Sequence, residues 1–314
     1  MKRYAIYTLI MILGGLNPLL AAFSTAPGFQ TMELYNTRGT STTIGGLAWD
    51  AGKLYFGQHT AIKTLEPAQP DQVQTLGTLP SNTGIALVMH QADRTYTAFG
   101  TDYNSPFPYQ MDYFDSTAGF ILQWEEDGIY DYAVNSQGEC YIVANPEAGG
   151  SKIFQLDLNT GGATEIAYLG GFAGGLVFDA ADNLYYADQG DGARSAGVIK
   201  FTPNQVTTGG LTAADGSLVL PITAGYIGFD ENGRFLATTG WGATLAEYDL
   251  TTSPKIRDIA YGSISQFVCD GASIYCVDTD WTDFASTIQR IVPEPASITL
   301  LGLAGVMLIR KKRP

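Results

Sequence analysis

The chain has 314 residues, of which 45% are apolar and 15% are charged. This composition supplies enough apolar residues for a packed core and too little charge for a disordered or coiled-coil protein. The 31 acidic residues outnumber the 17 basic ones, and the formal net charge of −14 argues against a nucleic-acid partner held through its phosphates. Three cysteines are too few for a disulfide framework, and two histidines leave little for a zinc site.

The N-terminus has the pattern of a secretory signal peptide. Two basic residues at positions 2–3 precede an almost uninterrupted apolar run over 4–20, and small residues follow, with Ala22 and Ser24 in the small-x-small spacing. Because the apolar run is short and ends in small residues, we predict a cleaved signal helix over residues 1–24 rather than a permanent membrane anchor.

The C-terminus combines three parts in a fixed order. They are Val292-Pro293-Glu294-Pro295, an uncharged stretch of fourteen residues at 296–309, and Arg310-Lys311-Lys312-Arg313. A helix over the uncharged stretch would be about 21 Å long, short of the roughly 30 Å hydrocarbon core of a bilayer. Basic residues at both ends of the chain are expected to stay on the cytoplasmic side, so the part between them is expected to be exported.

In this order of parts, the last residues from Val292 onward resemble the PEP-CTERM sorting signal of Gram-negative bacteria. The resemblance assigns residues 293–314 to the signal and implies a short hydrophobic helix that enters the membrane transiently. It also implies cutting near Pro-Glu-Pro by an exosortase-type enzyme. The protein would then pass from an inner-membrane intermediate to the cell surface or extracellular matrix. Without the six basic residues of the two ends the net charge becomes −20, which favours cationic or neutral partners.

Between the two ends, a β-hairpin pattern recurs about every forty to fifty residues, a period typical of propeller blades. Each copy has an apolar strand, a turn with Asp, Asn or Gly, and a second strand that begins with an aliphatic residue and often contains Tyr. The six copies lie at 46–55, 85–96, 132–141, 175–185, 226–235 and 266–275.

A second hairpin follows most copies, at 152–157 with 163–169, at 198–201 with 218–221, and at 245–249 with 256–261. Four strands in each of six repeats predict an all-β, six-bladed β-propeller over residues 29–292. The last repeat ends one strand short at 288–292, so we expect 29–35 to supply that strand and close the ring. Seven blades are the alternative, because 209–221 is long for one repeat.

The hairpins at 178–185 and 229–235 look like those of NHL-type and gluconolactonase-like propellers. The shared motif encodes a turn and a core position, so the resemblance implies fold rather than function. Gluconolactonase-like enzymes hold a metal in the channel through Glu, Asn and Asp, but the motif positions here offer no clear Glu. The repeated turn acids, which we interpret as acceptors of backbone hydrogen bonds, are Asp50, Asp179, Asp230 and Asp270.

The cysteines Cys140, Cys269 and Cys276 are expected to be small buried hydrophobic residues. Cys269 and Cys276 flank the turn of the last hairpin at diagonal positions on one face, which is a poor geometry for a bridge. A disulfide between these two is the alternative, since the export compartment is oxidising.

The loops after the second strand of each repeat carry acidic and aromatic residues, which on one rim would suit a sugar or a cation. The candidate ligand-binding residues are Asp102, Asp188, Asp191, Trp241, Asp278, Asp280, Trp281 and Asp283. The carboxylate spacings at 188–191 and 278–283 are usable by Ca²⁺, although neither follows the EF-hand pattern. The aromatic-rich insertion at 101–118 is expected to cap part of this rim.

Three functions remain open. The first is a non-enzymatic, exported surface or matrix protein whose propeller is a scaffold for polysaccharide or surface proteins. The second is a metal-dependent hydrolase of the lactonase or esterase type, and the third is a purely structural matrix component. No catalytic residue is assigned, because neither histidine lies in a motif with Cys or Ser that would mark a nucleophile.

Overall fold

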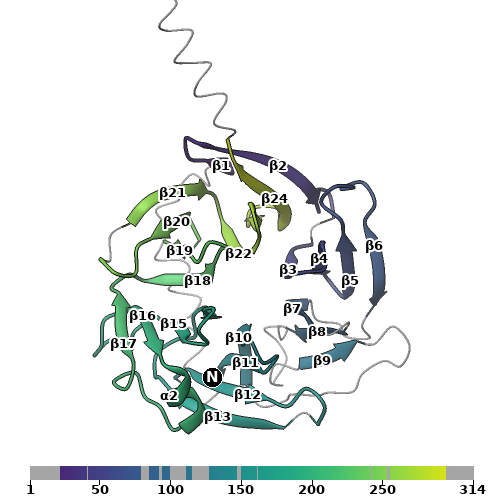
Figure 1. The fold of residues 1–314 in the computed structure, drawn as a ribbon. Helices are drawn as coiled ribbons and strands as arrows, with labels where there is room; N and C mark the ends of the chain where they lie inside the picture. The colour runs from purple at the N-terminus through teal and green to yellow at the C-terminus, as the bar shows by residue number, and fades with distance from the viewer. Residues whose placement is uncertain are drawn as a thin grey trace, which may run out of the picture.

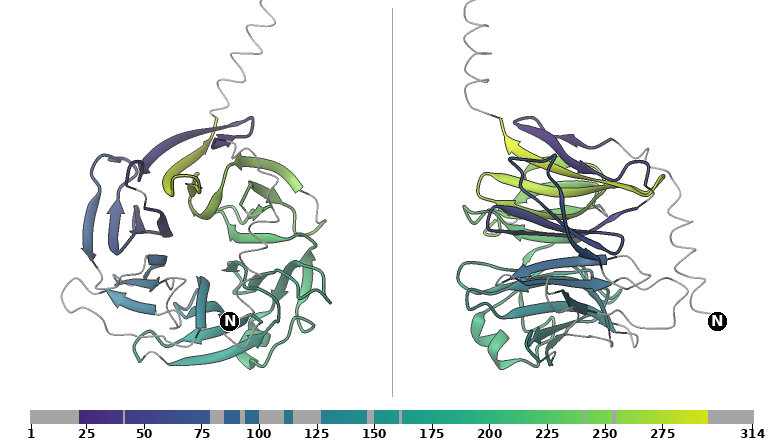
Figure 2. Two further views of the ribbon diagram at one scale, coloured as in Figure 1. Left: turned by 180° about the vertical axis from the view of Figure 1, so that it is seen from behind. Right: turned by 90° about the vertical axis from the view of Figure 1, so that its right-hand side faces the viewer.

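The computed structural model describes residues 22–40, 42–78, 85–91, 94–99, 111–114, 127–146, 150–160, 162–240, 242–252 and 255–294. Its strands form six antiparallel sheets that stand around a common centre (Figure 1). Figure 2 shows the same ring from behind and from its edge. In most sheets the strands follow chain order from the centre outward, as in a β-propeller.

The first sheet contains β3 (Ile44–Asp50), β4 (Lys53–Gln58), β5 (Ala61–Leu65) and β6 (Gln74–Thr78). The second contains β7 (Ile85–Gln91), β8 (Arg94–Phe99) and β9 (Met111–Phe114). The third contains β10 (Asp127–Val134), β11 (Cys140–Pro146), β12 (Lys152–Leu156) and β13 (Ala163–Tyr168).

The fourth sheet contains β14 (Leu176–Phe178), β15 (Leu184–Asp188), β16 (Gly197–Phe201) and β17 (Ser217–Leu220). The fifth contains β18 (Ala224–Phe229), β19 (Phe235–Thr239), β20 (Thr244–Tyr248), β21 (Lys255–Tyr261) and, at its edge, β1 (Ser24–Thr25). The sixth contains β22 (Ile264–Asp270), β23 (Ser273–Asp280), β24 (Ala285–Pro293) and β2 (Phe29–Asn36).

The all-β propeller prediction is thereby confirmed, and all six predicted hairpins are present. Five sheets are complete blades of at least four strands, whereas the sheet β7–β9 has three strands in the described part of the chain. The described residues therefore form five complete blades, so neither the prediction of six such blades nor the alternative of seven is met. Residues 209–221, on which the seven-blade alternative rested, follow the short helix α2 (Pro203–Thr208) and end in β17 of the fourth blade.

Ring closure by the N-terminal strand is also confirmed. β2 pairs antiparallel with β24, from Phe29 opposite Pro293 to Asn36 opposite Thr287. Just beyond this ladder, the Glu294 N–H donates to the Gly28 carbonyl at 2.9 Å. The chain therefore leaves the propeller directly at the predicted Pro-Glu-Pro motif.

The predicted flanking helices lie outside the described residues, since the description begins at residue 22 and ends at 294. Within that part, no helix has the length and apolarity needed to span a bilayer. Ser24, the last residue of the predicted signal segment, belongs to β1 and lies opposite Tyr261 of β21.

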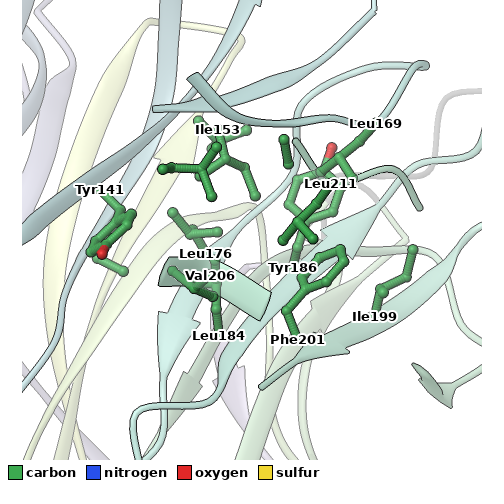
Figure 3. Packing of buried hydrophobic residues seen from close by; sticks show 14 of the residues in the cluster. Tyr141, Ile153, Leu169, Leu176, Leu184, Tyr186, Ile199, Phe201, Val206 and Leu211 are labelled. Carbon is green, nitrogen blue, oxygen red and sulfur yellow. The ribbon is translucent and has the colours of Figure 1, made fainter. Parts of the chain in front are cut away.

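Neighbouring blades meet through a recurrent pair of rings. A tyrosine from the second strand of one blade packs against a ring near the end of the first strand of the next blade. The centroid distances are 3.9 Å for Tyr55 with His90, 5.0 Å for Tyr141 with Phe178, 5.1 Å for Tyr185 with Phe229, and 5.1 Å for Tyr275 with Trp49. Between the third and fourth blades, aliphatic side chains pack together with the rings of Tyr186 and Phe201 (Figure 3).

Two of the four turn acids, Asp179 and Asp230, accept backbone hydrogen bonds as predicted. The Asp179 Oδ1 accepts the backbone N–H groups of Ala181 and Asn183, each at 2.9 Å, and Asp230 does the same for the N–H groups two and four residues on. The tyrosine of the ring pair adds its hydroxyl at two of these turns, where Tyr185 donates to Asp179 and Tyr275 donates to Asp270.

All three cysteines are free thiols, so the alternative disulfide is absent. Cys140 and Cys276 are buried, and Cys269 is half-buried against the fifth and sixth blades. Burial raises the pKa of the Cys140 and Cys269 thiols to about 12. They therefore stay protonated at neutral pH and pack as small hydrophobic groups.

Leu34 of β2 tests how far closure stabilises the ring, because it is 5% exposed and packs between the sixth and first blades. We expect Leu34→Ala to lower the free energy of unfolding by about 2–4 kcal/mol, since the cavity falls at the closing junction. Met32→Ala, on the same strand but 45% exposed, should change it by less than about 0.5 kcal/mol. Urea unfolding measures both, and equal effects would contradict an energetic role for the closing strand.

Candidate functional site

Five of the six innermost strands share an irregularity near the same end. The register of the first hairpin shifts early in β3, β7, β10, β18 and β22, so one or two residues there fall outside the ladder. Such bulges bend a strand and re-aim a side chain. In β10 the residue outside the ladder is Tyr130, and in β18 Tyr226 is one of two.

Tyr130 and Tyr226 stack on one another although their blades are not neighbours. Their ring centroids lie 5.2 Å apart with an interplanar angle of 15°. The fourth blade stands between them in the ring. Directly before β14 of that blade, the Gly175 N–H donates to the Gly225 carbonyl of the fifth blade at 2.7 Å. A Cβ at Gly175 would lie 2.7 Å from the Ile227 nitrogen, so only glycine permits this close approach of the fifth blade.

Asp131 directly follows the bulge and is 6% exposed. Its Oδ2 accepts the Leu176 N–H of the fourth blade at 2.9 Å. Burial is the main cause that raises the Asp131 pKa from 3.8 to about 7, and the hydrogen bonds from the backbone of Leu176 and Tyr132 lower it only in part. This carboxyl group is therefore partly protonated at neutral pH.

The two phenols beside Asp131 stay protonated. Burial, with a contribution from the Asp131 charge, raises the pKa of Tyr130 to about 12. Burial, with contributions from Tyr130 and then Asp131, raises the pKa of Tyr226 well above its usual value. The hydroxyl groups of Tyr130 and Tyr226 are hydrogen-bonded to each other. A carboxyl that titrates near pH 7 next to a phenol donor is an arrangement suited to general acid–base chemistry.

None of these three residues is among the site residues predicted from the sequence. The sequence did contain a signal, which is an acidic residue within an apolar strand. That residue, Asp131, directly precedes the hairpin copy 132–141. Its burial depends on the fourth and fifth blades, which lie far along the chain.

The candidate ligand residues of the loops form two groups, on the fourth and sixth blades. Asp102 and Trp241 lie outside the described residues. In the first group, Asp188 is 1% exposed and its Oδ2 accepts the Nε–H of Arg194 at 2.9 Å. Arg194 also donates to the Leu169 carbonyl, and its N–H is accepted by Asp191 Oδ1. The Asp188 charge is thus neutralised within its own loop.

The second group is Asp278, Asp280, Trp281 and Asp283, at the end of β23 and the start of the loop to β24. Asp278 Oδ1 accepts the Ser263 N–H at 2.6 Å, and burial, with a smaller contribution from the Asp280 charge, raises the pKa of Asp278. The fifth blade lies between the two groups in the ring (Figure 1), and among the described residues no hydrogen bond or ion pair joins them.

A metal ion such as Ca²⁺ needs several oxygen ligands in one place. Among the described residues, no three His, Cys, Asp or Glu side chains are grouped so that they could hold one. At the centre of the ring, Asp131 has phenols and backbone amides around it. Phenols and backbone N–H groups around a single carboxyl group do not fit a metal centre.

Solved propellers of several activities share this fold. A gluconolactonase from Xanthomonas campestris has 14% identity, a TM-score of 0.59, and coverage of 88% of this chain and 93% of its own. Regucalcin, a calcium-binding protein from Agrobacterium tumefaciens, has 12% identity, a TM-score of 0.57, and coverage of 85% and 96%. A PQQ-bound aldose sugar dehydrogenase from Streptomyces coelicolor has 14% identity, a TM-score of 0.56, and coverage of 85% and 100%. No protein-family profile and no curated protein matches the chain.

The raised pKa of Asp131 predicts a pH-dependent stability. Because the folded state holds this proton more tightly than the unfolded chain, the free energy of unfolding should fall by about 2–4 kcal/mol as the pH rises from roughly 4 to 7, and this contribution should level off above. Asp131→Asn should remove the slope, since its amide oxygen still accepts the Leu176 N–H. Urea unfolding at a series of pH values measures it, and an unchanged slope in the variant would show that other groups cause it.

Proposed function

We propose that this chain is a hydrolase of the lactonase or esterase type, with its reaction centre at Tyr130, Asp131 and Tyr226. The observation that carries this proposal is a buried carboxyl group with a pKa of about 7 beside stacked phenols at an inner-strand bulge. A group with that pKa accepts and returns a proton at neutral pH. Similarity of fold to a gluconolactonase supports the same class of reaction.

In the proposed reaction, the Asp131 carboxylate takes a proton from water while the water oxygen attacks the carbonyl carbon of the substrate. The Tyr130 hydroxyl donates a hydrogen bond to the carbonyl oxygen as that oxygen gains negative charge. The bond from the carbonyl carbon to the leaving oxygen then breaks, and the proton on Asp131 passes to that oxygen. The carboxylate is restored, and the products are an acid and an alcohol, joined in one molecule when a lactone opens.

The test of this proposal is whether the purified propeller, residues 29–292, hydrolyses a panel of aliphatic lactones and p-nitrophenyl esters. Asp131→Asn should lower kcat by at least about 100-fold, because an amide cannot accept the water proton. Asp157→Asn, at an exposed carboxylate in the β12–β13 turn, should keep full activity. Absence of turnover on every substrate, or equal activity of the Asp131 variant, would overturn the proposal.

The second candidate is a binding scaffold at the cell surface or in the extracellular matrix, and a purely structural matrix role is the third. An exposed Trp281 beside acidic residues favours the scaffold over the structural role. All three proposed functions are compatible with export through the signal segment 1–24. They are equally compatible with sorting through residues 293–314 by an exosortase-type partner. Regucalcin, a calcium-binding protein, shares the fold, so Ca²⁺ binding belongs to the same set of proposals, although the carboxylates at 278–283 are not grouped to hold the ion.

Processing at both ends predicts the mass of the mature protein. In a Gram-negative host that has the exosortase-type enzyme, the surface form should lack the basic tail 310–313 and end near Pro295. Glu294→Ala should retain the tail in a membrane fraction, because the cut depends on the motif. Intact-mass analysis of both forms is the measurement, and a full C-terminus in a soluble cytoplasmic form would contradict sorting.

A further inference from the structure

The loop between β23 and β24 exposes two large aromatic side chains within four residues. Trp281 is 52% exposed and Phe284 is 55% exposed. Among the described residues, only Tyr168 and Phe172 are comparably exposed aromatics. Scattered exposed hydrophobic residues are ordinary on protein surfaces, but here two aromatic side chains of one short loop each leave about half of their surface in solvent.

A hydrogen bond at the polar edge of the Trp281 indole holds the ring in place. Its Nε1–H donates to the Ser263 Oγ at 2.9 Å, and the Ser263 N–H donates to Asp278 Oδ1 at 2.6 Å. Asp278 itself is paired into the β22–β23 ladder. The ring is therefore fixed at its polar edge while much of its surface stays in solvent, and a ring fixed in advance loses little entropy when a ligand stacks on it.

Two carboxylates flank the indole in sequence. Asp280 Oδ1 accepts the Thr282 N–H at 2.8 Å, and Asp283 Oδ1 accepts the Ala285 N–H at 3.0 Å. These bonds fix the loop and use one oxygen of each group. In the portion of the chain that the structure covers, neither carboxylate forms a salt bridge. Both negative charges are thus left for a ligand.

We propose that this loop binds amine-bearing sugars, with one pyranose face on the Trp281 ring and a protonated amine at Asp280 or Asp283. The flat apolar face matches the C–H face of a sugar ring, and a cation beside an aromatic ring and a carboxylate gains from both. The charge of the whole chain, −14, attracts a cationic polymer and repels an anionic one. This site lies on the sixth blade and does not depend on the proposed hydrolase centre.

Calorimetric titration of the full propeller at low salt with a glucosamine tetramer is the test. We expect binding that weakens at least about tenfold in Trp281→Ala and in the Asp280→Asn, Asp283→Asn double variant. The N-acetylglucosamine tetramer, which has the same rings without the positive charge, should bind at least about tenfold more weakly than the amine form.

Phe172→Ala is the matched control, since Phe172 is an aromatic residue of 61% exposure in the loop before β14. It should bind the amine tetramer as the unaltered protein does, and thermal melts should show all variants folded. The proposal is overturned by unchanged affinity in Trp281→Ala, by equal affinity for the two tetramers, or by binding to neither. Preferential binding of a lysine peptide of equal charge would also overturn it, and would assign the loop to a basic protein partner.

Discussion

The junction between neighbouring blades is the contact on which the ring depends. A propeller blade buries little by itself, and its stability comes from the faces that it shares with the blades on either side. In this chain one ring pair recurs at four junctions, with a tyrosine of one blade against a ring of the next, as in Tyr141 with Phe178. Where the tyrosine also reaches a turn acid, as Tyr185 reaches Asp179, one residue joins the hairpin turn to the junction.

The same constraint shapes the centre of the ring. Because the blades converge there, their inner strands approach so closely that Gly175 has room for no side chain against the fifth blade. The space left by glycine lets Tyr130 and Tyr226 meet across the fourth blade, and Asp131 reaches the Leu176 amide of that blade. The candidate reaction centre is thus a consequence of how tightly the inner strands pack.

Features that depend on residues close together in the sequence were predictable, whereas features that depend on contacts between distant blades were not. The six hairpins were found because alternation and turn residues act within about ten positions, and closure by residues 29–35 followed from counting strands in the last repeat. The pairing of Asp188 with Arg194 was missed because the acid was interpreted as a ligand, although its partner lies only six residues away. Asp131 was missed for a different reason, since its burial arises from two blades that follow it by 45 residues or more.

The identity of residue 131 separates a structural role from a chemical one. A link to the Leu176 N–H requires only an acceptor, and an asparagine oxygen would supply it without burying an ionisable group. Aspartate at this position lowers the stability of the folded state as the pH rises from about 4 to 7, because the charged form is buried without a salt bridge from the described cations. Aspartate at position 131 stabilises the fold less than asparagine would. A reaction that uses the Asp131 proton explains why the carboxyl group is present. The presence of a carboxyl rather than an amide therefore favours proton transfer at the centre of the propeller over a purely architectural link.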